Sequence, residues 1–257
     1  MKNELLTIGP FTVYGYGLMI AIGILAAYFT GEYRAKKKKM EYNQVFYIVL
    51  WCVAGGFVGA KILYWLTEWR TILKDPGFLL DSLTDGFVVL GGILGGILTA
   101  YIYCHIKKMD FLRYFDLLIP SVALAQGFGR MGCLLAGCCY GKETASHLAI
   151  TFTNSDFAPN HVPLVPTQIY ASVLDFAHYF VLILAAKHLK GKGQVAGLYL
   201  ILYSVGRFIL EFYRGDLERG SVGILSTSQF ISIFTLCAGL LLFLYGAVRK
   251  NTVDTQI

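Results

Sequence analysis

An arginine in an uncharged part of the chain is the residue whose type and position most clearly suggest chemistry. Arg130 follows an uncharged run from Leu117 to Gly129, and Gly129 and Gly132 flank it closely. A guanidinium does not lose its proton, so burying it is costly unless an anion or carbonyl groups meet it. The glycines keep side-chain bulk away and let a ligand approach the backbone. This pattern predicts an anion site at a membrane boundary.

A second group of charges interrupts a later apolar run. Arg207 and Glu211 are four residues apart, so they share one face of a helix and can form an ion pair. Arg214 lies three residues further on and extends that face. These residues form either a structural ladder of ion pairs or a phosphate site shared with Arg130, since arginine binds phosphate oxygens bidentately. We favour the phosphate site, because ionisable residues inside a membrane are usually functional.

Three thiols follow Arg130 within ten residues, at Cys133, Cys138 and Cys139. They can act as a redox pair, as an acyl or alkyl acceptor, or as ligands for a soft metal. Adjacent cysteines rarely reach one ion without strain, and no clear fourth ligand is present in the sequence. We therefore predict no metal site and no cofactor, and leave the role of the thiols open.

The composition places these residues in a membrane protein. The chain is 56% hydrophobic and 15% charged, with a mean hydropathy of +0.59, whereas soluble globular proteins carry about 25% charged residues. Several uncharged runs have the length that crosses a bilayer as a helix. We therefore predict an all-α polytopic membrane protein in which residues 1–257 form a single membrane-embedded domain.

The positive charges gather in short loops. The net charge of +6 is by itself compatible with nucleic-acid binding. The basic residues, however, lie between the apolar runs, as the positive-inside rule and attraction to anionic headgroups predict. We therefore expect a lipid bilayer, and no nucleic acid, as a partner. The clusters are Arg34 with Lys36 to Lys39, Lys107 with Lys108 and Arg113, Lys187 with Lys190 and Lys192, and Arg249 with Lys250.

Seven apolar stretches are predicted to span the membrane. They are residues 11–31, 45–66, 86–104, 114–135, 167–186, 195–213 and 222–248. Alternating crossings put all four basic clusters on one side, which places the N-terminus outside and the C-terminus in the cytoplasm. Residues 136–165 are polar enough to leave the bilayer and form a small extracytoplasmic subdomain, in which residues 147–152 have β-strand character.

Other residues are candidates to line the site, each with a simpler alternative. Gln126 can bond the ligand of Arg130 or merely bridge helices. Tyr16 opens the first span and also fits an interfacial aromatic belt. Gln168 follows a helix-starting proline and directs an amide into the outer half of the bundle. Gly91 and Gly92 belong to a small-residue pattern that either packs helices or lines a groove for a lipid.

A series of short motifs occurs in one order from about residue 12 to residue 240. Together the motifs resemble the bacterial prolipoprotein diacylglyceryl transferases, although no single one would suffice. They are Tyr16-Gly17-Leu18-Met19, Gly59-Ala60-Lys61, Leu90-Gly91-Gly92-Ile93-Leu94-Gly95, Gly129-Arg130-Met131-Gly132, Pro166-Thr167-Gln168-Ile169-Tyr170, Gly197-Leu198-Tyr199, Tyr203, Arg207, Glu211-Phe212-Tyr213-Arg214 and Ser226-Thr227-Ser228-Gln229.

This resemblance implies a specific reaction in the bacterial cytoplasmic (inner) membrane. Members of that family transfer the diacylglyceryl group of phosphatidylglycerol to the thiol of the lipobox cysteine in a prolipoprotein signal peptide. A thioether forms and glycerol 1-phosphate leaves. Phosphatidylglycerol and the prolipoprotein signal peptide are therefore the expected partners.

The resemblance also implies roles for individual residues. Arg130 and Arg207 would hold the phosphate and steady the departing group, and Glu211 would orient Arg207. The residues expected to bind the substrate are Tyr16, Gly91, Gly92, Gln126, Gly129, Gln168, Tyr203 and Arg214.

The sequence departs from the family pattern at positions that concern the mechanism. Leu90 stands where the family typically has a histidine that has been proposed as a general base, and Cys133 and Cys138 replace an asparagine and an acidic residue. Three hypotheses stay open. The chain is a transferase whose arginines lower the pKa of the substrate thiol, a protein in which Cys133, Cys138 and Cys139 supply thiol or metal chemistry, or a non-catalytic relative that binds lipid.

Overall fold

The computed structural model describes residues 4–8, 11–216 and 220–254. These residues are largely helical, and their strands form two-stranded antiparallel sheets. The chain divides into two compact units, one of residues 1–31 with 115–257 and the other of residues 32–114. Helices carry the architecture of both units, as the sequence predicts.

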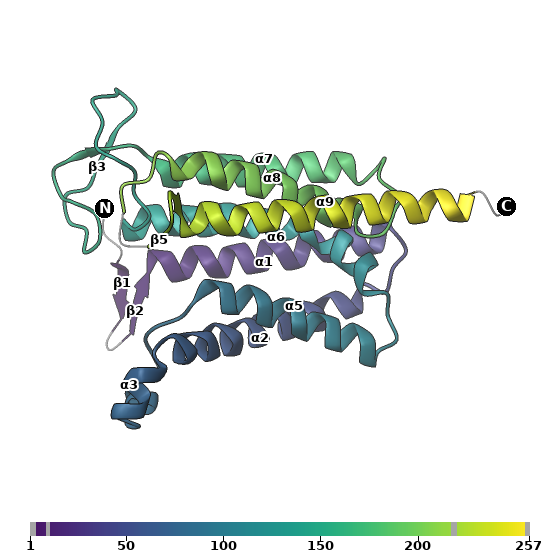
Figure 1. Cartoon of the computed structure of the whole chain (residues 1–257), viewed down its shortest axis with the longest axis horizontal. Helices are drawn as coiled ribbons and strands as arrows, with labels where there is room; N and C mark the ends of the chain where they lie inside the picture. The colour runs from purple at the N-terminus through teal and green to yellow at the C-terminus, as the bar shows by residue number, and fades with distance from the viewer. Residues whose placement is uncertain (1–3, 9–10, 217–219, 255–257) are drawn as a thin grey trace. The chain divides into compact units, whose positions relative to one another are not determined.

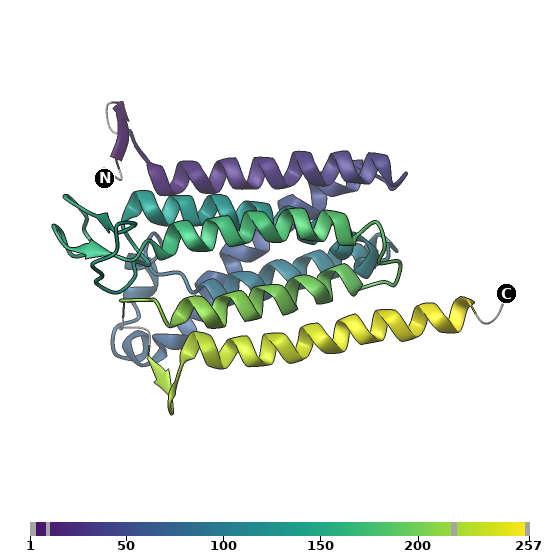
Figure 2. The ribbon, with the colours of Figure 1, turned by 90° about the horizontal axis from the view of Figure 1, so that it is seen from above.

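The first unit is a bundle of long helices that lie side by side (Figures 1 and 2). A hydrophobic core forms where three of them meet, from Ile119, Ala123, Leu182, Val195, Ala196 and Tyr199. The helices are α1 (Gly15–Lys37), α6 (Phe111–Ala136), α7 (Thr167–Ala185), α8 (Gln194–Glu211) and α9 (Thr227–Asp254), of which α1 and α6 each have one end in the other unit.

Polar contacts fix how the helices of this bundle are aligned. The Asp116 carboxylate of α6 accepts hydrogen bonds from the backbone N–H groups of Gly193 (2.6 Å) and Ala196 (2.8 Å) at the start of α8. It thereby satisfies donors that the first turn of a helix leaves without a helical partner. On the α1 side, Thr30 Oγ1 donates to Ser121 Oγ at 2.9 Å. The Asp116 contacts tie the start of α8 to α6, and the Thr30 contact ties α1 to α6.

Two short hairpins precede helices at the same end of the bundle (Figure 1). Strands β1 (Glu4–Ile8) and β2 (Phe11–Tyr14) pair ahead of α1. Strands β5 (Ser221–Val222) and β6 (Leu225–Ser226) pair ahead of α9.

The non-helical segment between α6 and α7 lies at that end too (Figure 1). It contains the antiparallel strands β3 (Ile150–Thr151) and β4 (Pro163–Leu164). A separate small core holds it together, made of Leu134, Phe152, Ala158 and Leu164. The segment coincides with the polar stretch that the sequence predicts as a subdomain, and β3 falls within its predicted strand.

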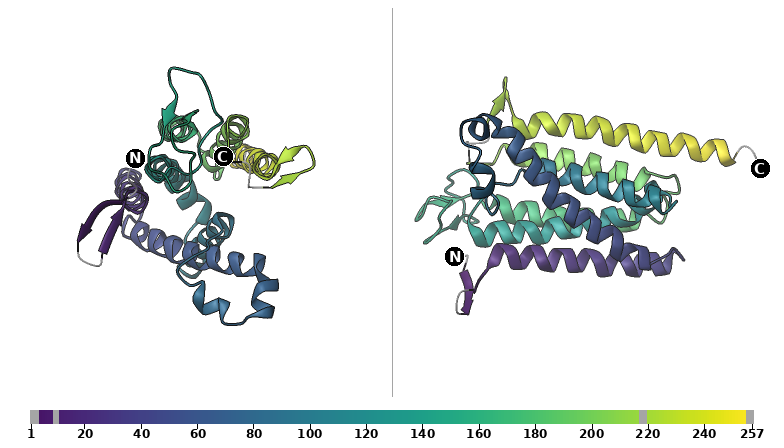
Figure 3. Two further views of the ribbon diagram at one scale, coloured as in Figure 1. Left: turned by 90° about the vertical axis from the view of Figure 1, so that its left-hand side faces the viewer. Right: turned by 90° about the horizontal axis from the view of Figure 1, so that it is seen from below.

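The second unit is built around the packing of α2 (Asn43–Thr67) on α5 (Val89–Ile106), with the short helices α3 (Trp69–Lys74) and α4 (Phe78–Asp81) between them in the chain (Figure 3). Glycines let the two backbones touch. A methyl group on Gly59 would strike the carbonyl oxygen of Gly91 and lie 2.9 Å from Gly95 Cα. The small-residue pattern therefore packs helices within this unit.

Lys61 of α2 binds the segment that precedes α5 in the same unit. Its side chain is buried, and Nζ donates to the carbonyl groups of Ser82, Asp85 (2.5 Å) and Gly86 (3.2 Å). Each buried proton donor of the ammonium thus meets an oxygen, which offsets the cost of removing the charge from water.

Among the described residues, six helices are long and apolar enough to cross a membrane: α1, α2, α5, α6, α7 and α9, the last as far as Arg249. Many large apolar side chains on them are exposed, Phe57 and Leu241 among them, as expected where a surface faces lipid. Helix α8, the sixth predicted span, has 18 residues but is not among the six, since Arg207 and Glu211 reduce its hydropathy. The helices fit a multi-pass membrane protein.

Two predicted span boundaries are wrong. Helix α1 begins at Gly15 because residues 11–14 pair as strand β2, and α9 begins at Thr227 because residues 221–226 form a hairpin. Both segments are apolar enough to extend a span on hydropathy alone. A short apolar run does not by itself distinguish a strand from the end of a helix.

Replacing Gly59 with alanine is expected to destabilise the second unit. The added methyl group cannot fit between two backbones, and overpacking of this kind costs about 1–3 kcal/mol. Thermal unfolding of the purified protein in detergent should show a fall in Tm of about 2–4 °C for each kcal/mol. Gly17→Ala is the control, since nothing lies within 4 Å of a methyl group there. Equal Tm values for the two variants would contradict the packing described for Gly59.

Candidate active site

Arg130 projects from the penultimate turns of α6. Its side chain is 24% exposed, and Nε lies 4.0 Å from Asp175 Oδ2 on α7. The flanking glycines have different roles. A methyl group on Gly132 would lie 3.2 Å from Tyr16 Cδ2 and Met19 Cβ, so this glycine lets α1 approach α6. A methyl group on Gly129 would meet none of the described residues of other elements within 4 Å, so there is open space beside this glycine.

Arg207 and Glu211 form the ion pair that their spacing predicts. Arg207 Nη2 lies 2.9 Å from Glu211 Oε2 and also donates to Ser228 Oγ of α9 at 2.8 Å. Both partners are largely buried, with side chains 12% and 9% exposed. The guanidinium is therefore held from two helices, which limits its motion.

Arg214 follows α8 and is held by a different carboxylate. Its Nε donates to Asp216 Oδ1 at 2.8 Å, while Glu211 Oε2 lies 4.0 Å away. Burial disfavours the charged form, but the hydrogen bond with Asp216 outweighs it and raises the pKa of Arg214 above its ordinary value. This arginine thus stays charged at every physiological pH.

These three arginines line one cavity, which has about 450 Å³ of space including its opening. Residues from α6, α7 and α8 form the wall: Arg130, Cys139, Thr167, Gln168, Ala171, Leu174, Asp175, His178, Tyr203, Arg207, Leu210 and Arg214. Three guanidinium groups and the Asp175 carboxylate belong to this lining, while Glu211 and Asp216 pair with two of the guanidinium groups. The cavity therefore combines several hydrogen-bond donors with apolar side chains.

Asp175 and His178 are residues of this wall that the sequence analysis did not select. They lie three residues apart on α7, and both are buried. Their Oδ1 and Nδ1 atoms are 3.9 Å apart. The available signal was two ionisable side chains inside an apolar span, which are functional candidates by default. Neither residue belongs to one of the short motifs that carry the family resemblance.

Gln168 and Tyr203 lie in the cavity wall, as expected from the sequence. Gln168 is almost fully buried, and its Nε2 donates to the Cys138 carbonyl at 2.8 Å. The neighbouring Thr167 hydroxyl donates to the Cys139 carbonyl at 2.8 Å. Tyr203 stacks on Tyr199, with ring centroids 5.9 Å apart. The start of α7 is thus fastened to the loop that follows α6.

Several other candidate residues do not line the cavity, namely Tyr16, Gly91, Gly92, Gln126, Gly129, Cys133, Cys138 and Glu211. Gln126 Oε1 accepts a hydrogen bond from Tyr199 at 2.5 Å, so it bridges α6 and α8, which was its simpler alternative. Gly91 and Gly92 belong to the second unit, where Gly59 and Gly56 face them. This close helix packing explains why glycine stands at both positions. Contact of Gly91 and Gly92 with a lipid stays a prediction.

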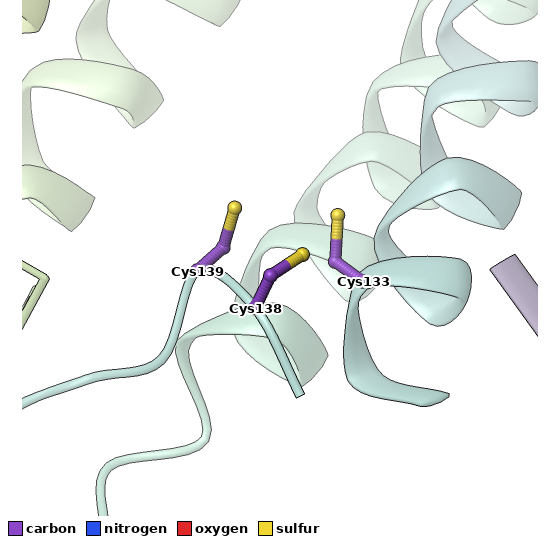
Figure 4. A group of neighbouring side chains, drawn as sticks. All are labelled: Cys133, Cys138 and Cys139. Carbon is purple, nitrogen blue, oxygen red and sulfur yellow. The ribbon is translucent and has the colours of Figure 1, made fainter. Parts of the chain in front are cut away.

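The three clustered cysteines come together at the end of α6 (Figure 4). The sulfur atoms of Cys133, Cys138 and Cys139 all lie within 4.8 Å of one another, and these three cysteines form no disulfide. Hydrogen bonds with the other two thiols, together with burial, raise the pKa of Cys138 above its usual range. Three sulfur ligands are one short of a structural zinc site, and the described residues offer no fourth ligand in this cluster.

The fold and the cavity together define a class of protein, namely a helical, multi-pass membrane protein with a cavity lined by arginines. Comparison with known families is more specific. The family model described as prolipoprotein diacylglyceryl transferase matches residues 3–245. The chain belongs to the prolipoprotein diacylglyceryl transferase family, which confirms the resemblance inferred from its motifs.

Curated relatives are similar in sequence to nearly the whole chain. A phosphatidylglycerol–prolipoprotein diacylglyceryl transferase of Clostridium tetani is 47% identical over 251 residues, which cover 98% of this chain and 100% of the relative. A second such enzyme, from Clostridium perfringens, is 47% identical over 93% of this chain and 94% of its own length. One from Finegoldia magna is 32% identical over 90% and 92%.

Proposed function

We propose that this chain transfers the diacylglyceryl group of phosphatidylglycerol to the lipobox cysteine thiol of a prolipoprotein. The observation that carries the proposal is the cavity at which Arg130 of α6 and Arg207 of α8 meet, in a chain whose family match includes both helices. A lipid phosphate needs such a pair of cations, next to an apolar path for its acyl chains.

The reaction sets clear requirements for the site. The thiol sulfur forms a bond to the terminal glycerol carbon while the bond from that carbon to the phosphate oxygen breaks. Negative charge develops on the departing glycerol 1-phosphate, and preorganised cations stabilise it best in a site that excludes water. Arg130 and Arg207 supply these cations as bidentate donors to the phosphate oxygens.

The other polar residues position these groups. Glu211, 2.9 Å from Arg207, orients that guanidinium, and Arg214 adds positive charge at the cavity wall. The open space beside Gly129 admits the lipid headgroup. The remaining residues proposed to contact substrate are Tyr16, Gly91, Gly92, Gln126, Gln168 and Tyr203.

We further propose that α8 is the seventh membrane span, so that the N-terminus faces outward and the C-terminus faces the cytoplasm. Helix α8 packs along α7 and α9 (Figure 2), and its charged groups are paired inside the bundle, which lowers the cost of spanning. This topology puts every basic cluster on the cytoplasmic side. Residues 136–165 are then extracytoplasmic, and residues 1–257 act as one domain in the bacterial cytoplasmic membrane.

Reconstitution tests this function directly. The purified chain is placed in vesicles of phosphatidylglycerol with a synthetic lipobox peptide, and mass spectrometry follows the peptide. We expect a diacylglyceryl adduct on the peptide cysteine, with release of glycerol 1-phosphate in equal amount. The same vesicles made with phosphatidylcholine are the lipid control. Absence of product from a folded, inserted protein would overturn the proposal.

The clustered thiols favour a second candidate function, in which they carry thiol or metal chemistry. Replacing Cys133, Cys138 and Cys139 together with alanine distinguishes the two. We expect the transfer rate to change by no more than about threefold, because in the proposed reaction the nucleophilic thiol belongs to the substrate peptide and the arginines hold the phosphate. The rate of adduct formation in the vesicle assay measures the effect. A loss comparable to that of the arginine variants would favour the thiol function instead.

A further inference from the structure

Two titratable side chains that the proposed phosphate site does not use share its cavity. Asp175 and His178 are each 5% exposed, and both line the wall together with Arg130 and Arg207. Thr167 lines the same wall eleven residues earlier on α7, so the cavity follows this helix for about 16 Å. The pair therefore lies in the wall of the same cavity, with Asp175 next to Arg130.

His178 is placed to handle a proton. Its Nδ1 lies 3.9 Å from Asp175 Oδ1, and none of the described residues forms a hydrogen bond with that nitrogen. Buried polar atoms are nearly always hydrogen-bonded, and an exception calls for a reason such as a catalytic role. Hydrogen bonds between catalytic groups are often long before the substrate binds, and they shorten in the complex with the substrate. A small rotation brings Nδ1–H onto the carboxylate, which leaves Nε2 as the proton acceptor.

Asp175 connects this histidine to the phosphate site. Its Oδ2 lies 4.0 Å from Arg130 Nε, while its Oδ1 faces His178. A phosphate held by Arg130 satisfies the guanidinium and repels the carboxylate. The carboxylate then moves toward His178 and fixes the imidazole in one tautomer. Binding of the lipid in this way completes the histidine–aspartate pair.

Other titratable groups at the cavity are less suited to accept a proton. The arginines stay protonated, and Glu211 is engaged by Arg207 at 2.9 Å. Tyr203 carries a phenol, and Cys139 carries a thiol like that of the substrate. The imidazole of His178 is therefore the group in this wall whose chemistry suits general-base catalysis near neutral pH.

We propose that His178, oriented by Asp175, accepts the proton of the substrate thiol during diacylglyceryl transfer. The proposal rests on the function proposed above. As the sulfur–carbon bond forms and the carbon–oxygen bond to phosphate breaks, the thiol proton moves to Nε2 of His178. It then passes to the departing glycerol 1-phosphate or to water, and the histidine returns to its neutral form.

The vesicle assay with His178→Gln tests this role. Glutamine keeps most of the size and polarity of histidine but accepts no proton, so we expect the rate of thioether formation to fall by about 10²–10⁴-fold. His188→Gln is the matched control, because His188 lies just beyond α7 and is exposed. Its rate should equal that of the wild type.

A peptide with selenocysteine in place of the lipobox cysteine separates catalysis from structure. A selenol is ionised at neutral pH and needs no base, so this peptide should restore His178→Gln to within about tenfold of the wild-type rate. It should not rescue Arg207→Ala, which lacks the phosphate contact. Wild-type thiol transfer by His178→Gln, or an equal loss with both peptides, would overturn the role of His178. If the wild-type chain forms no product with either peptide, the proposed function is overturned, and this role with it.

Discussion

Replacing Arg130 with alanine is expected to lower the rate of diacylglyceryl transfer by about 10³-fold or more. The variant loses a buried cation at the point where charge develops on the departing phosphate, and removing one such donor typically costs about 10²–10³-fold. It also leaves Asp175, 4.0 Å away, without its counter-ion. The carboxylate then repels the phosphate, which adds to the loss. Initial rates of adduct formation in phosphatidylglycerol vesicles measure the effect.

Arg130→Lys separates charge from geometry at this position. Lysine keeps the positive charge but not the planar fork that binds two phosphate oxygens, so we expect an intermediate loss. Arg113→Lys on the same helix is the control, because Arg113 is exposed and should tolerate the change. An Arg130→Ala variant with the wild-type rate would contradict the proposed contact of Arg130 with the phosphate.

Arg207 and Glu211 are expected to act as one unit. Arg207→Ala should lower the transfer rate by about 10²–10³-fold through loss of a phosphate contact, and Glu211→Gln should lower it by about tenfold or more. Since we propose that Glu211 acts by orienting Arg207, the double variant should be no slower than Arg207→Ala alone. Such non-additivity marks residues that share one interaction.

The transfer rates of the same three variants also test the alternative, in which Glu211 does not orient Arg207. If Glu211 only stabilised the helix bundle, the two losses would multiply, and the Tm of Glu211→Gln would fall in parallel with its rate. Thermal unfolding in detergent is therefore recorded beside each transfer rate. A double variant slower by the product of the single effects would contradict the orienting role.

The membrane class, the family and the main arginines could be predicted from the sequence, because each depends on local properties of the chain. An apolar run of about twenty residues identifies a span by its composition. The four-residue spacing of Arg207 and Glu211 brings them to one helix face whatever the rest of the fold does, and their ion pair is observed. The glycines around Arg130 predicted open space beside the arginine, which the structure shows for Gly129 but not for Gly132, where α1 packs closely.

The contents of the cavity depend on packing between distant parts of the chain, which periodicity does not encode. Arg130, Asp175 and Arg207 come from three helices, and only their packing brings them to one wall. The sequence pointed to a transferase without a side-chain base, since Leu90 accepts no proton. Asp175 and His178 could be recognised as a candidate base only in the folded bundle, because the burial of α7 gives an isolated aspartate and histidine their shared environment.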